Sequence, residues 1–263
     1  MYENTSKTLL ILRTLNETEK LKNDNSPPQC NKSNIIIVLI LVISVSISIV
    51  PQYPYAGAQN NNNPVVAAPD SRPQGLTYGQ WAAKWWQWAY SIPRDQSPLY
   101  DQTGERCGIK QTSPVWFLAG TFGGSAVRQC TIPAGVSLFF PILNTECSIA
   151  GGDGKTEQDL RKCAKAQIDR ARNLEVNIDG VRIQDLKKYR AQSQLYTISL
   201  PANNIMGVHG PTTSPSIAEG YWIFLNPLST GKHEIVFASG AGEVSVTSSM
   251  NFLTRTTYHI TVK

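Results

Sequence analysis

Residues 174–183 read LEVNIDGVRI, and this stretch decides the fold class. Two short runs, Leu174–Ile178 and Val181–Ile183, stand on either side of the dipeptide Asp179–Gly180, and the first alternates apolar with polar residues. An Asp–Gly pair is a two-residue turn that β-hairpins prefer, because both central residues of that turn need a positive φ. The stretch therefore predicts a β-hairpin.

Similar strand signals recur along most of the chain. Short apolar or alternating runs, separated by glycine and proline turns, occupy Val115–Ala119, Val127–Ile132, Ser137–Leu143, Gln194–Leu200, Tyr221–Leu225, His233–Ala238 and Tyr258–Val262. About nine or ten short strands of this kind predict a mainly β fold. We expect a β-sandwich of the jelly-roll type. Pro141 lies inside one run and indicates that this strand bends or lies at a sheet edge.

Two segments have a helical period instead. Thr77 and Gln80 form a T-x-x-Q capping box, and apolar residues then recur every three or four positions, so we expect a helix over about 78–90. Thr156 and Asp159 hold the same positions before a second expected helix, over about 157–172. Both helices are accessory to the β domain in this interpretation.

The first helix carries four tryptophans in eight residues, namely Trp81, Trp85, Trp86 and Trp88. Their spacing on an apolar face is typical of a helix packed on a sheet, which is the favoured interpretation. A membrane-proximal or partner-binding patch and a surface that stacks on sugar rings are the alternatives. Trp86 lies at the edge of this face, so we expect it to be partly exposed and to be the binding residue of such a patch.

An apolar segment precedes the domain. Ile35–Val50 reads IIIVLILVISVSISIV, sixteen residues without a charge. Lysines precede it and no basic residue follows until Arg72, which places the N-terminus in the cytoplasm. Ala56 and Ala58 form an A-x-A cleavage pattern before Gln59. We predict an export signal that is cleaved there, with a retained single-pass anchor as the alternative.

The chain accordingly divides into four parts. We expect a cytoplasmic n-region over 1–34, the signal or anchor over 35–50, a cleavage region and disordered tether over 51–75, and an extracytoplasmic β domain over 76–263. The domain is expected at the cell surface or outside the cell. The membrane is a partner, through residues 35–50, if the signal stays uncleaved.

The formal net charge is +5, and residues 1–58 carry five basic against four acidic residues, which leaves +4 for the rest. We expect this excess to be spread along the domain. This is not the dense basic stripe of a nucleic-acid binder, so nucleic acid is not an expected partner.

Four of the five cysteines, Cys107, Cys130, Cys147 and Cys163, lie in the predicted exported domain, where disulfides form. Four cysteines allow three pairings, and sequence alone does not choose between them. Cys107–Cys130 and Cys147–Cys163 are favoured because each pair closes a local loop. No two of these cysteines have the close spacing of a zinc site.

No catalytic residue is predicted, because the usual motifs are absent. Gly123–Val127 (GGSAV) lacks the second glycine of a nucleophile elbow and precedes a strand. His209, His233 and His259 form no close pair, although the strands of the last two could pair and bring them together. The segment that begins at Asp153 lacks calcium-loop spacing. We therefore expect no metal and no cofactor.

Five motifs stand out along the domain: WAAKWWQW at 81–88, DQTGERCG at 101–108, PVWFLAGT at 114–121, CTIPAGVSLFFPI at 130–142 and GYWIFLNPLSTGKHEIVF at 220–237. Together they resemble the motifs of a group of exported bacterial and archaeal proteins with no assigned activity. The resemblance covers about Leu76 to the C-terminus and implies an exported protein, but no site residue.

The absence of catalytic motifs and the expected disulfides predict a cell-surface or envelope protein. We expect a non-catalytic binding or structural module with a protein or glycan partner. One alternative is a secreted, hydrolase-like enzyme or metal-binding protein whose site is assembled from distant His, Asp and Glu residues. A self-assembling surface component is another.

Overall fold

The computed structural model describes residues 65–242 and 252–263. The predicted n-region, the apolar segment and the cleavage motif at Ala56 and Ala58 lie outside these residues and stay predictions. In the described part, no helix combines the length and the apolar character needed to cross a bilayer.

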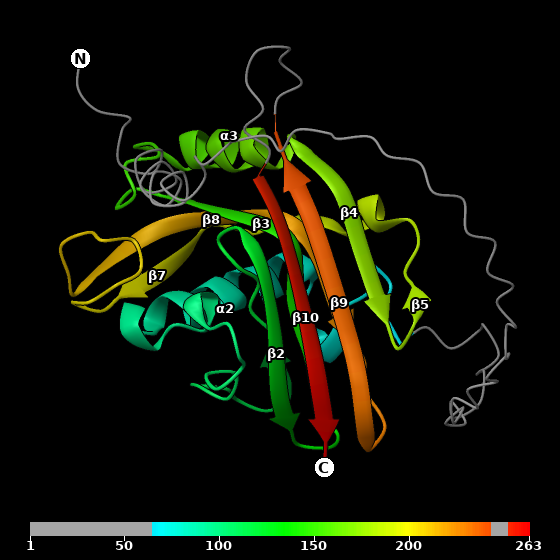
Figure 1. The fold of residues 1–263 in the computed structure, drawn as a ribbon. Coiled ribbons are helices and arrows are strands. Elements are labelled where there is room, and N and C mark those ends of the chain that lie inside the picture. Colours follow the sequence, from blue (N-terminus) through cyan, green and yellow to red (C-terminus); the bar gives the residue numbers. More distant parts are fainter. Residues whose placement is uncertain (1–64, 243–251) are drawn as a thin grey trace, which may run out of the picture. The chain divides into compact units, whose positions relative to one another are not determined.

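The described chain is mainly β, as predicted, with ten strands in two sheets and two α-helices (Figure 1). The first sheet has the order β1–β3–β8–β6, with β7 also paired to β8; the strands are β1 (Val115–Phe117), β3 (Ser137–Ser148), β8 (Thr212–Leu225), β6 (Arg190–Gln192) and β7 (Tyr196–Leu200). The second sheet has the order β2–β10–β9–β4–β5, from β2 (Gly124–Ile132), β10 (Phe252–Val262), β9 (Gly231–Ala241), β4 (Ala171–Ile178) and β5 (Val181–Arg182).

The strand order corrects the jelly-roll prediction. Strand β1 runs parallel to β3 in the first sheet, and β2 runs parallel to β10 in the second, whereas a jelly roll is antiparallel throughout. Strand β10 pairs the last residues of the chain with β2, which lies 130 residues earlier, since Thr254 stands opposite Gly124. Such long-range pairing leaves no local mark in the sequence, which is why the prediction missed it.

The hairpin at 174–183 is confirmed. Strands β4 and β5 pair antiparallel with Ile178 opposite Val181, and the turn residues Asp179 and Gly180 have φ values of 51° and 81°. Both central residues thus adopt the left-handed conformation that this turn requires.

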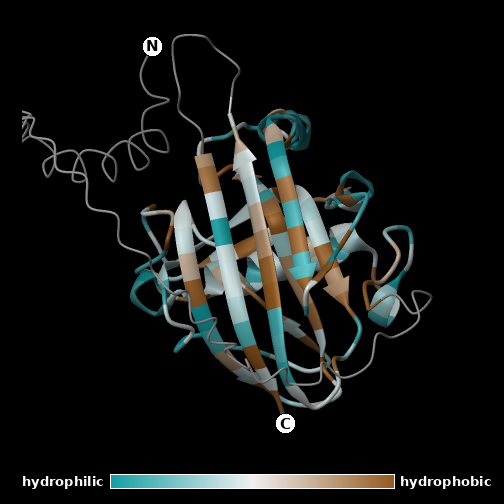
Figure 2. Cartoon of the chain, turned by 45° about the vertical axis from the view of Figure 1, so that its right-hand side comes forward, coloured by the Kyte–Doolittle hydropathy of each residue, from teal (hydrophilic) through white to brown (hydrophobic). Residues whose placement is uncertain are grey.

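The first sheet is buried on both faces. Alternate residues of β3 and β8, such as Phe140 and Ile223, face the second sheet and pack on Phe237 and other side chains of its inner face. Phe139 and Trp222, one position along, pack on α2 (Tyr78–Ser91) instead. The continuous apolar run of β3 follows from this double burial, while the second sheet shows the banded pattern of a sheet with one solvent face (Figure 2).

Two local predictions are corrected or refined. Helix α3 (Glu157–Ile168) ends four residues earlier than expected, because Ala171 and Arg172 pair with β9 as the start of β4. Pro141 lies within β3 at a register shift with β8, so the bend is confirmed. It lies two residues past Phe139, the last residue of β3 that pairs with β1, so among the described strands it has a paired neighbour on one side only.

The start of the domain lies earlier than expected. Residues 65–75, assigned to the disordered tether, pack on the domain, where Val66 is buried and bridges to Leu225.

A candidate binding cleft beside the tryptophan helix

Helix α2 begins where the capping box predicts. The backbone N–H of Gln80 donates to Thr77 Oγ1 at 3.2 Å, and the N–H of Thr77 donates to Gln80 Oε1 at 2.9 Å. The helix then packs on the first sheet through Trp85, whose ring meets Trp222 at 5.7 Å and whose Nε1 donates to Leu118 O at 3.0 Å. Core packing, the favoured interpretation of the tryptophans, is confirmed.

Trp86 is not the exposed residue that its position on the helix predicted. Its exposed fraction is 6%, and its ring packs against Trp85 at 5.0 Å and Tyr90 at 4.8 Å. The helix contacts β7 as well as β8, two neighbouring strands of the first sheet, so this sheet covers a wide face of the helix. A role for Trp86 in binding stays a prediction, without the exposed surface that motivated it.

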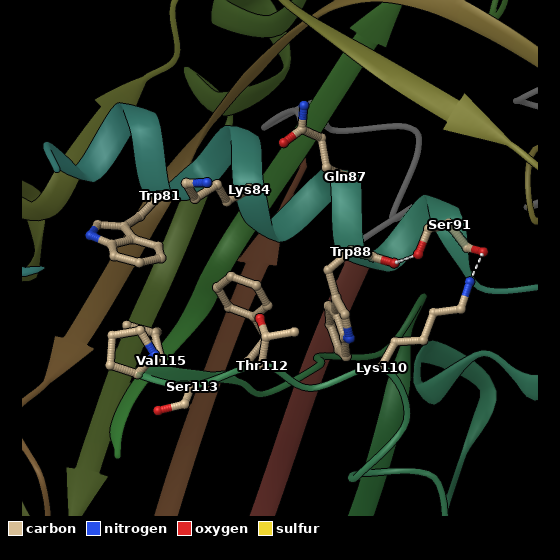
Figure 3. Close-up of a pocket in the computed structure, with 11 residues that line it drawn as sticks. Trp81, Lys84, Gln87, Trp88, Ser91, Lys110, Thr112, Ser113 and Val115 are labelled. Carbon is tan, nitrogen blue, oxygen red and sulfur yellow. Dashed lines mark hydrogen bonds between the residues drawn. The ribbon is translucent and has the colours of Figure 1, made fainter. Parts of the chain in front are cut away.

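A cleft of about 400 Å³ lies between α2 and the segment 110–117, as Figure 3 shows. Trp81 and Trp88 point from the helix toward this segment, and Lys110 reaches back to the end of the helix. The lining residues are Trp81, Lys84, Gln87, Trp88, Ser91, Lys110, Thr112, Ser113, Pro114, Val115 and Phe117. Ligand sites of known proteins have volumes of roughly 300–1,000 Å³, so the cleft has the size of a small-ligand site.

The cleft floor is aromatic and its polar atoms are already bonded. Trp81 Nε1 donates to Pro73 O and Trp88 Nε1 donates to Ile109 O, both at 2.9 Å. Phe117 packs between them, with its ring 6.3 Å from that of Trp81 and 5.5 Å from that of Trp88. The floor is therefore aromatic carbon, but each of these three side chains is only 6–7% exposed, so little of it is open to a ligand.

Among the described residues, the rim carries two positive charges and no negative one. Lys110 Nζ donates to Ser91 O at 2.8 Å, where the unpaired carbonyls at the C-terminus of α2 favour a cation. Lys84 is exposed, and in the described part of the chain its ammonium group has no acidic partner. The hydroxyl groups of Thr112 and Ser113 likewise form no side-chain hydrogen bond with described residues.

The strand that forms one wall is closed along its outer edge. Strand β1 is the last strand of the first sheet, and the Gln111 side chain covers its free backbone. Phe117 N–H donates to Gln111 Oε1 at 2.9 Å, and Gln111 Nε2 donates to Phe117 O at 2.8 Å. Thr112 also forms a bridge with Val115.

Buried polar contacts hold the loop that leads into this wall. Asp101 accepts backbone hydrogen bonds from Thr103, Gly104 and Arg106 at 2.8–3.0 Å. Burial alone would raise the pKa of Asp101, but these hydrogen bonds outweigh it and lower the pKa below the usual 3.8. The Cys107–Cys130 disulfide ties the same loop to β2.

Both favoured disulfides are confirmed, since Cys107 is bonded to Cys130 and Cys147 to Cys163. Cys147, Cys163 and Asp153 are near enough to one another to share a metal ion, but the two thiols are consumed by their own bond. Asp153 accepts a hydrogen bond from Ser148 N at 2.9 Å, and Asp159 serves as the helix cap, which accounts for these two acids without calcium.

The two late-strand histidines do not meet. His233 lies opposite Ile260, whose side chain is buried, whereas His259 lies opposite Glu234 on the other face and approaches its carboxylate at 3.6 Å. Residues of one cross-strand pair share a face and neighbours along a strand alternate, so these imidazoles point to opposite sides of the second sheet.

His233 instead forms a set with Asp179 and Ser229 that has the composition of a catalytic triad. Its Nδ1 lies 2.7 Å from Asp179 Oδ2, and its Nε2 lies 3.5 Å from Ser229 Oγ but only 2.9 Å from Ser229 O. Because the carbonyl occupies Nε2, this nitrogen is not placed to take a proton from the hydroxyl. The set acts as a brace between the hairpin turn and the start of β9.

A buried carboxylate on β3 is a further feature that the sequence did not reveal. Glu146 accepts hydrogen bonds from Tyr90 at 2.7 Å and from Ser216, and Ser216 in turn lies 3.3 Å from the hydroxyl of Tyr196. Burial, and then the nearby Glu146, raise the pKa values of Tyr90 and Tyr196 well above 10. These groups come from four elements far apart in sequence, so only the fold brings them together.

Comparisons with known proteins add little to this geometry. No family model matches the chain, and no curated protein matches its sequence. Among solved structures, the cysteine protease inhibitor EhICP2 from Entamoeba histolytica is 13% identical over 54% of this chain and 88% of its own, with a TM-score of 0.19. PbICP-C, solved in complex with falcipain-2, is 13% identical over 57% and 100%, with a TM-score of 0.21.

Amebosin, known from a solution structure, is 11% identical over 53% of this chain and 96% of its own, with a TM-score of 0.15. All three scores are too low to support a conclusion about function.

Proposed function

We propose that this chain is an exported, non-catalytic binding module that holds its ligand in the cleft between α2 and residues 110–117. The composition of the cleft lining carries the proposal: among described residues it holds aromatic rings, hydroxyls and two lysines, with no histidine, cysteine, aspartate or glutamate. Lysine, serine and threonine can also act in catalysis, but a nucleophile needs a base within hydrogen-bond reach, and here Lys110 Nζ and Ser91 Oγ donate to backbone carbonyls instead of pairing with each other. The lining thus suits retention of a ligand better than its conversion.

The compartment in this proposal has independent support. Two disulfides fit an extracellular protein, because such bonds persist in oxidising surroundings. The export segment at 35–50, its cleavage before Gln59 and the resemblance to exported bacterial and archaeal proteins all point to the same compartment. N-terminal sequencing and a thiol count of protein recovered from cells test this part: an N-terminus at Gln59 and no free thiols among the four domain cysteines are expected.

Filling the cleft tests the binding site itself. Thr112 is exposed on the cleft wall, so Thr112→Trp places an indole in the ligand space, while Thr131→Trp adds the same group to an exposed position on β2. Labelled wild-type protein is applied to an array of neutral and acidic oligosaccharides and peptides. We expect Thr112→Trp to abolish the wild-type signals and Thr131→Trp to retain them.

Two results would contradict the proposal. Equal binding by Thr112→Trp and wild type would place the ligand elsewhere on the molecule. Chemical conversion of a bound array ligand, abolished by a single substitution in the cleft, would replace a binding module by an enzyme.

A further inference from the structure

We infer that the cleft recognises an acidic saccharide, a sugar ring that carries a carboxylate or a sulfate group. This inference rests on the proposed function and adds the chemical class of the ligand. It starts from the charge of the site: among the described residues that line the cleft, only Lys84 and Lys110 are ionisable. Lys110 already bonds Ser91 O, whereas Lys84 has no acidic partner among described residues, so an anionic group on the ligand would pair with Lys84 and also be attracted by Lys110.

The hydroxyl groups of the wall and the aromatic residues of the floor favour a sugar as the part of the ligand that carries this negative charge. Sugar rings combine apolar C–H faces with hydroxyl groups, and aromatic side chains are common partners of such faces. Trp81, Trp88 and Phe117 line the floor but are only 6–7% exposed, so they contribute a small apolar contact rather than an open stacking face. The hydroxyls of Thr112 and Ser113 form no side-chain hydrogen bond with described residues, so they are available on the opposite wall to bond sugar hydroxyls.

An acidic peptide fits the same site less well. Extended peptides commonly bind by adding a strand to a free sheet edge, where backbone hydrogen bonds supply the affinity. Strand β1 is the sheet edge at this cleft, but Gln111 occupies the backbone N–H and C=O of Phe117, and Thr112 bridges to Val115. The edge is therefore closed to a further peptide strand. A saccharide does not need the backbone groups of β1, because it can bond the side chains of the cleft.

A competing explanation for any affinity toward acidic polymers lies elsewhere on the chain. Residues 161–190 contain nine Lys and Arg residues against four Asp and Glu residues, so the basic excess is concentrated rather than spread along the domain as the sequence interpretation had it. A non-specific attraction would arise from this segment. Lys162 is an exposed lysine of α3 within it and provides the matched control for Lys84, the exposed lysine of α2.

The experiment measures dissociation constants by calorimetry for the full exported domain. The probes are oligogalacturonate, the neutral galacto-oligosaccharide of the same length, a sulfated galacto-oligosaccharide and polyglutamate. We expect saturable binding of an acidic oligosaccharide, with the neutral one at least about tenfold weaker. Lys84→Gln and Lys110→Gln should each weaken acidic-sugar binding about fivefold, and Lys162→Gln should leave it unchanged.

The carboxylated and sulfated probes decide which anion the lysines prefer, and a preference for either one supports the inference. Glutamine at position 110 still has an amide that can donate to Ser91 O, so a loss of affinity there reports the charge. Lys84→Arg, which keeps the charge, should retain most of the affinity. Equal melting temperatures of the variants exclude misfolding as the cause.

Several results would overturn the inference. They are equal affinity for the neutral and acidic sugars, a loss in Lys162→Gln as large as in Lys84→Gln, polyglutamate bound as tightly as oligogalacturonate, or no acidic probe bound up to about 10 mM. If Thr112→Trp abolishes binding of an array ligand but the lysine variants do not weaken it, the cleft is a binding site and only the acidic class is wrong. If Thr112→Trp has no effect, the proposed function itself fails.

Discussion

The replacement of Arg128 by methionine tests how the cleft wall is held in place. This residue of β2 is 1% exposed and lies between the two sheets. Its Nε donates to Asp101 O at 2.7 Å, its Nη2 to Gly120 O at 3.1 Å, and its Nη1 to both Ala119 O and the hydroxyl of Tyr258. It therefore joins the loop that begins at Asp101 to the residues that follow β1.

The expected cost follows from these contacts. Methionine fills much of the space of the arginine stem but leaves the carbonyls of Asp101 and Gly120 without the donor that they have in the native protein. Ala119 O keeps a partner, because Tyr258 Oη donates to it at 3.0 Å. A buried acceptor left unpaired costs about 1–3 kcal/mol, and release of a desolvated guanidinium offsets part of the total, so we expect a loss of about 3 kcal/mol in the free energy of unfolding.

Urea unfolding followed by tryptophan fluorescence measures this change, with Arg182→Met as the control. Arg182 is exposed on β5, the last strand of the second sheet, and its substitution should change the free energy of unfolding by less than about 0.5 kcal/mol. If Arg128→Met changes the free energy of unfolding by less than about 1 kcal/mol, the cost of burying the guanidinium charge offsets the stabilisation from its four hydrogen bonds. The idea that Arg128 holds the wall would then be wrong.

Three further predictions concern stability. Replacing Cys147 and Cys163 by alanine should lower the free energy of unfolding by about 3 kcal/mol, since the bond closes a loop of sequence separation 16; a lower denaturation midpoint without a change in fold is the expected observation. Thr77→Ala removes the cap of α2 and should cost about 1 kcal/mol, measured the same way, and an unchanged midpoint would show that packing alone sets the start of the helix. The pKa of Asp101 is lower in the folded than in the unfolded protein, so its ionised carboxylate stabilises the fold at pH values above the unfolded-state pKa. This contribution should disappear as the pH falls below about 4. In Asp101→Asn the free energy of unfolding should therefore fall less steeply with decreasing pH, and the same pH dependence as in the wild type would contradict the assignment.

The sequence predicted those features that depend on neighbouring residues. The two helix caps need only side chains three residues apart, and the hairpin at Asp179 needs only a dipeptide that tolerates positive φ. Helix α3 was predicted too long for the same reason. Its apolar spacing continues through Ala171, and only the partner strand β9, far along the chain, turns that residue into the start of a strand.

The error at Trp86 has a different physical origin. A helical period identifies a buried stripe if one surface covers the helix, and the edge of that stripe is then exposed. Here β7 and β8 both contact α2, so the edge position is covered as well. The pairing of β7 with β8, across the loop between Leu200 and Thr212, widens the same sheet beneath the helix, and no pattern within the helix sequence records it.

The cleft depends both on local sequence patterns and on long-range strand pairing. The tryptophan motif could therefore be recognised in the sequence, whereas the site itself could not. Trp81 and Trp88 were visible as members of an unusual cluster, but their bonded indole N–H groups give them a supporting role in the floor. The groups left free for a ligand, Lys84 and Thr112, look ordinary in sequence because exposed lysines and threonines are common. They become candidate ligand-binding residues only in the folded chain, where β1 forms the edge of the sheet and a disulfide and a buried arginine hold the opposite wall. A search for function by motif finds the residues that build such a site, whereas the residues that recognise the ligand are identified by their unbonded polar atoms in the folded chain.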